Sequence, residues 1–263
     1  MKGTEYISII PGNINYASPL SQDWYRTSVA HNTVVLNHTE QNFSSAQCIA
    51  FGQENKTEYA ITRTDNAYDS VHFVRTVALL NPNLVLVVEQ LKSDKKNPSL
   101  FDIAYHQSGI WRDTTNGEVW DAPNVKGYKY ITDAFIVKNQ LESYLATKLM
   151  SGRTVMISAA TNVPMDIITG YGKEFMKKNV PIVIYRMKTN AVVLVYCIAL
   201  DGQKIKIHFD PLNDSNIKNI PSYNLVKFQL EDIYRNKKNI IINPDKIDLS
   251  GLKILNSRAF SIE

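Results

Sequence analysis

The sequence lacks the short motifs that identify the commonest enzyme classes. Its 263 residues contain no Gly-x-Ser-x-Gly nucleophile elbow, no Gly-x-x-x-x-Gly-Lys phosphate loop and no His-Glu-x-x-His metal motif. It has only two cysteines, Cys48 and Cys197, which are too few for a thiolate zinc site. Both lie in apolar, strand-like segments, which favours free thiols over a disulfide. The chemistry that depends on these motifs is therefore excluded.

Long apolar runs and concentrated charge are also missing. The longest apolar run covers residues 191–200 and is well short of the ~20 residues that cross a bilayer, so we expect no membrane partner. The formal charge of +4 is mild and its lysines and arginines are scattered, which argues against a nucleic-acid partner and suits an acidic ligand. Residues 1–5 lack the apolar segment of a signal peptide. We therefore expect either a cytoplasmic chain or a piece of a longer precursor.

Helical periodicity is absent, and strand patterns take its place. Apolar segments rich in Val, Ile, Tyr and Phe alternate with period two or run continuously, and Asn, Gly, Asp or Pro ends each of them. The clearest hairpin turns at Asn81-Pro82-Asn83, where proline fixes one dihedral and asparagine tolerates the left-handed region. Residues 225–234 fit either a strand or a helix. The other segments predict strands at residues 6–10, 33–36, 46–51, 57–62, 72–80, 84–91, 100–107, 117–120, 130–137, 145–150, 154–158, 165–168, 181–187, 191–199, 204–210, 240–242 and 252–255.

So many short strands separated by tight turns predict an all-β fold. We expect a large antiparallel β-sandwich, or supersandwich, with a small appended C-terminal β region. A cluster of polar residues and breakers at residues 210–216 marks a possible boundary. The predicted division is a sandwich over residues 1–210 and a C-terminal extension, or small sheet packed on it, over residues 211–263.

Histidine is the residue type best placed for chemistry. The sequence has five: His31, His38, His72, His106 and His208. His31 precedes a predicted strand beside Asn32, and His106 ends another, so the two could meet at one rim of the sandwich. Imidazoles and a carboxylate would suit zinc there. Alternatively, each histidine is a hydrogen-bonded residue of the sheet, which is our interpretation of His72 and His208.

Aromatic residues gather with an arginine just before His31. Tyr16, Trp24, Tyr25 and Arg26 lie within eleven residues of one another. Aromatic rings stack on pyranose faces, and a guanidinium binds a carboxylate through two bonds. The cluster is therefore compatible with a groove for an acidic sugar, although all-β proteins are rich in tyrosine in any case.

The same segment carries a family resemblance. Pro11-Gly12, then Tyr16, then Trp24-Tyr25-Arg26 leading into Ala30-His31-Asn32-Thr33-Val34-Val35 resembles the start of the C-terminal β-sandwich of the heparinase II/III-like polysaccharide lyases, which include heparinases and oligo-alginate lyases. Residues 73–89 are similar to that family's arginine-bearing hairpin. Tyr105-His106-Gln107-Ser108-Gly109 is similar to the tyrosine-histidine that ends its next strand. The resemblance covers about residues 8–200.

The resemblance implies one half of a two-part enzyme. In this family an N-terminal helical toroid and the sandwich enclose a cleft, where uronate-containing polysaccharides such as alginate or heparan sulfate are cleaved by β-elimination. We therefore expect two partners, an acidic polysaccharide or oligosaccharide and the toroid domain of the same enzyme. The full-length enzyme would be periplasmic or secreted. The alternatives are a stand-alone carbohydrate-binding or structural sandwich without catalysis, and an accessory domain of a glycosidase.

The resemblance also assigns roles to individual residues. His31 matches a histidine that helps to bind a structural zinc in several members. Tyr16 lies close to a tyrosine that reaches the substrate in exolytic alginate lyases, in an alignment that needs a one-residue gap and leaves Tyr25 as a competitor. We expect Tyr16 and His31 to be catalytic, with His31 also a metal ligand. The residues that we expect to bind substrate are Trp24, Tyr25, Arg26, Asn32 and His106.

Several departures from the family pattern limit what this chain can do alone. The upstream His-Gly-His is absent, and Ile10 stands where an aspartate is common. Of the three usual zinc ligands only His31 remains, so we expect no cofactor in this chain, with zinc possible in the full-length enzyme. The toroid that supplies the principal catalytic tyrosine and the asparagine that neutralises the uronate would precede Met1. We expect the chain alone to be inactive.

Overall fold

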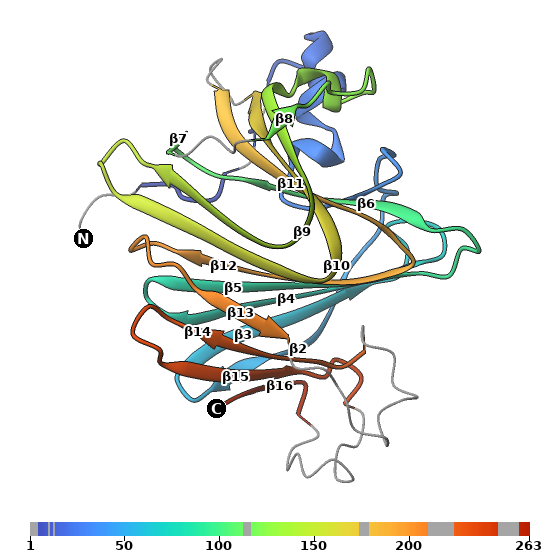
Figure 1. Ribbon diagram of the computed structural model, residues 1–263. Helices are drawn as coiled ribbons and strands as arrows, with labels where there is room; N and C mark the ends of the chain where they lie inside the picture. Colours follow the sequence, from blue (N-terminus) through green and yellow to red (C-terminus); the bar gives the residue numbers. More distant parts are fainter. Residues whose placement is uncertain are drawn as a thin grey trace.

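Nearly all regular structure in the chain is β-strand (Figure 1). The computed structural model describes residues 5–9, 11–12, 14–112, 117–173, 179–209, 224–246 and 258–263. Three short helical turns accompany the strands: η1 (Ser21–Tyr25), η2 (Ser28–Ala30) and η3 (Tyr128–Tyr130). The strands are β1 (Val34–Leu36), β2 (Gln47–Glu54), β3 (Thr57–Thr64), β4 (Val71–Asn81), β5 (Leu84–Ser93), β6 (Ser99–His106), β7 (Ile110–Trp111), β8 (Glu118–Val119), β9 (Thr132–Lys148), β10 (Thr154–Lys173), β11 (Asn179–Thr189), β12 (Ala191–Ala199), β13 (Lys206–Phe209), β14 (Val226–Glu231), β15 (Lys237–Ile242) and β16 (Phe260–Ile262).

The long strand β10 joins the two halves of a 12-stranded antiparallel sheet. Its second half, from Asp166, pairs with β11, which continues through β6 to β1. Its first half pairs with β12, which continues through β5, β4 and β3 to β2. The register with β9 shifts between Ala160 and Met165, where an irregularity lets the strand bend. One strand thus belongs to both halves of the sheet.

The main core lies between these two halves, because alternate residues of each strand point inward. Phe101, Ile103 and Tyr105 of β6 belong to the same buried cluster as Val192, Leu194 and Tyr196 of β12. The arrangement is the face-to-face packing of a β-sandwich. The predicted all-β class and large antiparallel sandwich are therefore confirmed.

Each outer face of the sandwich is also covered. A second, four-stranded sheet, β13-β14-β15-β16, packs against the β12 side, where Val195 and Cys197 contact a cluster that includes Phe228 and Phe260. The N-terminal segment and residues 120–131 cover the β11 side. There Trp24 belongs to a third buried cluster, which includes Ile182 and Ile184 of β11. Figure 1 shows these layers in order, with the blue N-terminal segment at the top and the orange-red small sheet at the bottom.

The structure differs from the sequence-based strand assignments in several places. The predicted strands at 130–137 and 145–150 are one strand, β9, and those at 154–158 and 165–168 are one strand, β10. Bulges explain both errors, because they absorb breakers such as Pro164 without ending the strand. Residues 6–10 form only an isolated bridge, Ser8 to Gln107, and Ile10 lies outside the described residues. Within residues 225–234 the strand β14 covers Val226–Glu231, and no helix forms there.

The predicted domain division stays a prediction. Residues 210–223, which contain the proposed boundary, and the predicted strand at 252–255 lie outside the described residues. Both cysteines are free as expected, although Cys48 is exposed and only Cys197 is buried. No helix within the described ranges is long and apolar enough to cross a membrane.

The close approach of the N-terminal segment to β10 can be tested at a glycine. Gly172→Ala should lower the free energy of unfolding by about 1–3 kcal/mol, because the new Cβ would lie 2.6 Å from Cζ2 of Trp24, a ring that is 1% exposed. Gly52→Ala is the control: its Cβ meets nothing nearer than Oη of Tyr59 at 3.5 Å, so the change should stay within about 0.5 kcal/mol. Urea unfolding measures both. Equal stabilities would show that Trp24 does not pack on this strand.

Candidate functional site

Asn32 ties the N-terminal segment to the end of β6. Its Nδ2 donates to Oγ of Ser8 at 2.7 Å and to the carbonyl of Ile9 at 3.2 Å. Its Oδ1 accepts from the backbone N–H of His106 at 2.7 Å, and its backbone carbonyl accepts from Nη1 of Arg75 at 2.9 Å. One residue therefore fixes where the segment crosses the rim of the sandwich.

His31 precedes this residue and is held in a defined tautomer. The turn η2 brings its Nδ1 to 2.8 Å from the carbonyl of Thr27. A carbonyl can only accept a hydrogen bond, so Nδ1 carries the hydrogen and the neutral ring leaves Nε2 with a free lone pair. The side chain is half-buried. The ring can therefore accept a proton, or bind a metal, through Nε2.

His106 lies against Trp24 and is almost completely buried. The ring centroids are 6.1 Å apart, and His106 is 3% exposed. Burial, followed by the nearby His31, lowers the pKa of His106 to about 3. Nε2 of His106 is buried and has no hydrogen-bond partner within the described part of the chain. A cavity of about 10 Å³, roughly the size of one water molecule, lies between Trp24, His106 and Lys173.

The structure brings together four of the residues expected at the site. Trp24, His31, Asn32 and His106 meet at the end of β6, as the positions of the two histidines in the sequence predict. Tyr16 lies on the surface with 77% of its side chain exposed, and Arg26 is exposed as well.

Two of the aromatic residues expected to bind substrate are packed inside the protein. Trp24 is 1% exposed and donates from Nε1 to the carbonyl of Lys173 at 2.6 Å. Tyr25 belongs to the same buried cluster beneath the N-terminal segment. In this geometry both rings contact protein rather than solvent. Their assignment to substrate binding stays a prediction, as do the substrate-binding role of Arg26 and the catalytic role of Tyr16.

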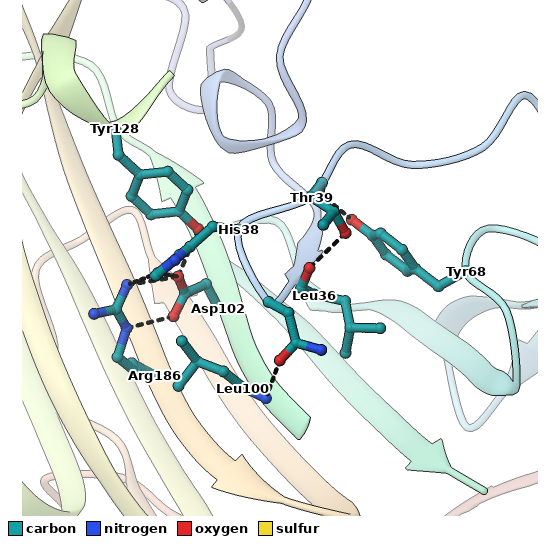
Figure 2. Close-up of polar contacts among 9 residues, drawn as sticks. Leu36, His38, Thr39, Tyr68, Leu100, Asp102, Tyr128 and Arg186 are labelled. Carbon is teal, nitrogen blue, oxygen red and sulfur yellow. Dashed lines mark hydrogen bonds and ion pairs between the residues drawn. The ribbon is translucent and has the colours of Figure 1, made fainter. Parts of the chain in front are cut away.

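A buried network around Asp102 was missed by the sequence analysis. Figure 2 shows Arg186, Tyr128 and His38 converging on this carboxylate, which is 1% exposed. Nε and Nη2 of Arg186 donate to its two oxygens at 2.7 and 2.8 Å, and the Tyr128 hydroxyl donates to Oδ2 at 2.5 Å. Nη2 of Arg186 also lies 2.9 Å from Nε2 of His38. An aspartate inside the apolar run Leu100-Phe101-Asp102-Ile103-Ala104 was the available signal.

The network shifts the pKa values of His38 and Tyr128. Burial lowers the pKa of His38, and the Arg186 cation acts in the same direction while Asp102 opposes them. Burial, together with the Asp102 carboxylate, raises the pKa of Tyr128. Tyr128 belongs to η3 and His38 to the turn after β1. The network therefore connects η3 and the turn after β1 to the sheet through hydrogen bonds.

A second buried ion pair supports the site from inside the sandwich. Nε of Arg75 donates to Oε1 of Glu89 at 2.8 Å, and Glu89 is 0% exposed. Burial raises the pKa of Glu89, and the Arg75 guanidinium opposes that rise. Because Arg75 also donates to the carbonyl of Asn32, the ion pair connects the core to the loop that carries His31.

The residues present do not fit a zinc site of the expected kind. Within the described ranges no three or more histidine, cysteine, aspartate or glutamate side chains gather in a way that could hold a metal. His31 offers one nitrogen through Nε2, and Nε2 of His106 is buried and has no hydrogen-bond partner among the described residues. Two imidazoles alone do not close a tetrahedral site.

Comparisons with known proteins give consistent results. A family model described as heparinase II/III-like, C-terminal, matches residues 5–139. A crystal structure of heparinase III shares 13% identity and a TM-score of 0.62, over 89% of this chain and 33% of that chain. Heparan sulfate lyase HepC from Pedobacter heparinus shares 15% identity and a TM-score of 0.60, over 90% of this chain and 34% of that chain. No curated protein sequence matches. This chain thus spans about a third of these solved proteins, and at such identities the likeness shows the fold alone.

His106 should stay neutral across the physiological pH range. Its ring signals in NMR spectra can be assigned with a His106→Gln variant. They should not shift between about pH 7.5 and about pH 5, because burial lowers the pKa of His106 to about 3, whereas the pKa of an exposed histidine is ~6.5. The unfolded chain binds the proton more readily in that window, so stability from neutral His106 is present above about pH 6.5 and is lost as the pH falls.

His72 provides the contrasting titration within the same spectra. Its ring nitrogens lie 2.8 Å from Asp65 and 2.9 Å from Asp94, and these hydrogen bonds raise its pKa. Its signals should therefore shift above about pH 6.5. Titration of His106 near its ordinary value would contradict the buried position described here.

Proposed function

Because this chain belongs to the heparinase II/III-like C-terminal family, we propose that it forms the β-sandwich wall of a polysaccharide lyase cleft. The substrate is a uronate-containing polysaccharide of the alginate or heparan sulfate type, cleaved by β-elimination. An N-terminal helical toroid of the same enzyme forms the other wall, and the enzyme acts in the periplasm or outside the cell. The observation that carries the proposal is the family match over residues 5–139, a range that contains His31, Asn32 and His106.

The chemistry of β-elimination defines what such a wall must provide. The proton next to the uronate carboxylate is barely acidic until that carboxylate is neutralised, so the cleft needs a cationic or hydrogen-bonding clamp and a base. His31 is suited to accept a proton because its Nε2 is unprotonated in the tautomer fixed by Thr27. The Asn32 side chain already bonds Ser8, Ile9 and His106, which favours a positioning role over direct contact with substrate.

The isolated chain should fold but show negligible lyase activity, because one wall holds only part of the catalytic set. The assay is the ultraviolet absorbance of the unsaturated uronate product on alginate, heparin, heparan sulfate and chondroitin sulfate, with a two-domain lyase of known activity as the positive control. Circular dichroism would verify that the chain is folded. Robust turnover on any of the four polymers would refute the proposal of a half-site.

His31→Ala, in a longer enzyme that includes the toroid, should lower turnover by roughly 10²-fold or more because a general base is lost. The change should cost only about 1–3 kcal/mol of stability. His208→Ala is the matched control, since His208 is 46% exposed on the small sheet. Rates are compared at equal concentrations of folded protein, so that lost stability does not count as lost catalysis.

Tyr16→Phe in the same enzyme should also lower turnover, since it removes one hydroxyl and keeps the ring. Its control is Tyr234→Phe, because Tyr234 is 73% exposed and Tyr16 is 77% exposed. Wild-type turnover in both His31→Ala and Tyr16→Phe would favour the alternative of a carbohydrate-binding or structural sandwich without catalysis.

A further inference from the structure

A tyrosine with two lysine ammonium groups over its ring lies beside the candidate site. Nζ of Lys129 is 5.1 Å and Nζ of Lys173 is 5.4 Å from the ring centroid of Tyr130. Both distances fall within the ~6 Å over which a cation is attracted to an aromatic face. The tyrosine belongs to η3, whereas Lys173 ends β10. Two segments that are distant in sequence thus build one basic, aromatic surface.

This surface is held in place by packing and hydrogen bonds from below. The ring of Tyr130 meets Trp24 edge-on with centroids 6.4 Å apart, and Nε1 of Trp24 donates to the carbonyl of Lys173 at 2.6 Å. Tyr128, in the same short helix as Tyr130, donates to the buried Asp102 (Figure 2). The backbone that carries these side chains is therefore held in place without a ligand.

Among the described residues, lysine side chains outnumber carboxylates at this surface. Nζ of Lys129 donates to Asp23 at 2.9 Å, and the Tyr130 hydroxyl donates to the same carboxylate at 3.2 Å. These bonds lower the pKa of Asp23 and keep it ionised, so it balances one ammonium group. Within the described part of the chain no carboxylate forms an ion pair with Lys173, and Lys126 is exposed nearby. The surface is thus suited to an anion.

We propose that Lys129, Tyr130 and Lys173 form a subsite for one acidic sugar unit of the substrate. The Lys173 ammonium group binds its carboxylate or sulfate, and Lys129, held beside it by Asp23 and the Tyr130 ring, adds a second cationic contact. The inference rests on the proposed function and names the residues that hold the polymer next to the histidines. Trp24 connects the two places, because its ring contacts both Tyr130 and His106.

The subsite can be tested by titration calorimetry on the whole chain. The probes are a hexasaccharide of alginate, a hexasaccharide of heparan sulfate, a neutral glucan hexasaccharide and a short single-stranded DNA. We expect the chain to bind one or both acidic sugars, more weakly as salt is added, and to bind neither the glucan nor the DNA comparably. Binding of alginate would show that a carboxylate is sufficient for recognition, and binding of heparan sulfate alone would show that sulfate is required.

The decisive variant removes both ammonium groups. Lys129→Ala combined with Lys173→Ala should weaken binding of the acidic sugar at least about tenfold, since each lost cation removes a charge-assisted contact. Lys188→Ala combined with Lys206→Ala is the matched control, because it removes the same charge from exposed positions at the other end of β11 and on β13. This control should bind within about twofold of the wild type, because neither lysine lies at the subsite. Thermal unfolding would establish that both variants fold.

Three outcomes of the comparisons would overturn the subsite. They are unchanged affinity in the Lys129 and Lys173 variant, equal weakening in the control, and binding of DNA as tight as that of the acidic sugars. A wild-type chain that binds neither acidic sugar would also overturn it. None of these results decides whether the family chemistry operates, because that question is answered separately by turnover of the His31→Ala variant in the longer enzyme.

Discussion

Asn32 holds the candidate site in position, because it satisfies polar groups from three other parts of the chain at once. Its side chain bonds Ser8, Ile9 and the backbone of His106, and its carbonyl receives Arg75. These bonds are part-buried or exposed, so each contributes about 0.5–1.5 kcal/mol. The loop is therefore held against β6, and His31, the residue before Asn32, is held in the same place.

Two buried carboxylates extend this constraint to the interior of the sandwich and to its outer face on the β11 side. Glu89 lies inside with Arg75, and Asp102 lies on the outer face with Arg186. Removing one partner of such a pair leaves a buried charge uncompensated, which costs about 3–5 kcal/mol. Both pairs also reach a covering segment, through Asn32 in one case and Tyr128 in the other. The scaffold is consequently rigid where the candidate site and the basic surface meet.

The charge distribution is consistent with one role for the whole rim. A histidine whose Nδ1 bonds the carbonyl of Thr27, the loop that carries it and a lysine-flanked tyrosine lie at the ends of β6 and β10. In the proposed role this surface would face a chain of acidic sugars, whose cleavage needs cations beside the carboxylates and a base at one point. As one wall of a cleft, it would bind and orient the polymer, and the reaction would be completed by groups on the opposite wall.

The sequence by itself determined the all-β class, the hairpin at Asn81-Pro82-Asn83 and the meeting of His31 with His106, because each follows from local alternation and from where a strand begins or ends. Only the tertiary structure decided that β9 and β10 are continuous, that Trp24 is buried, and that Asp102 pairs with Arg186. Those two residues are 84 positions apart in the sequence. Strand register brings them face to face, and no local pattern encodes the register between distant strands.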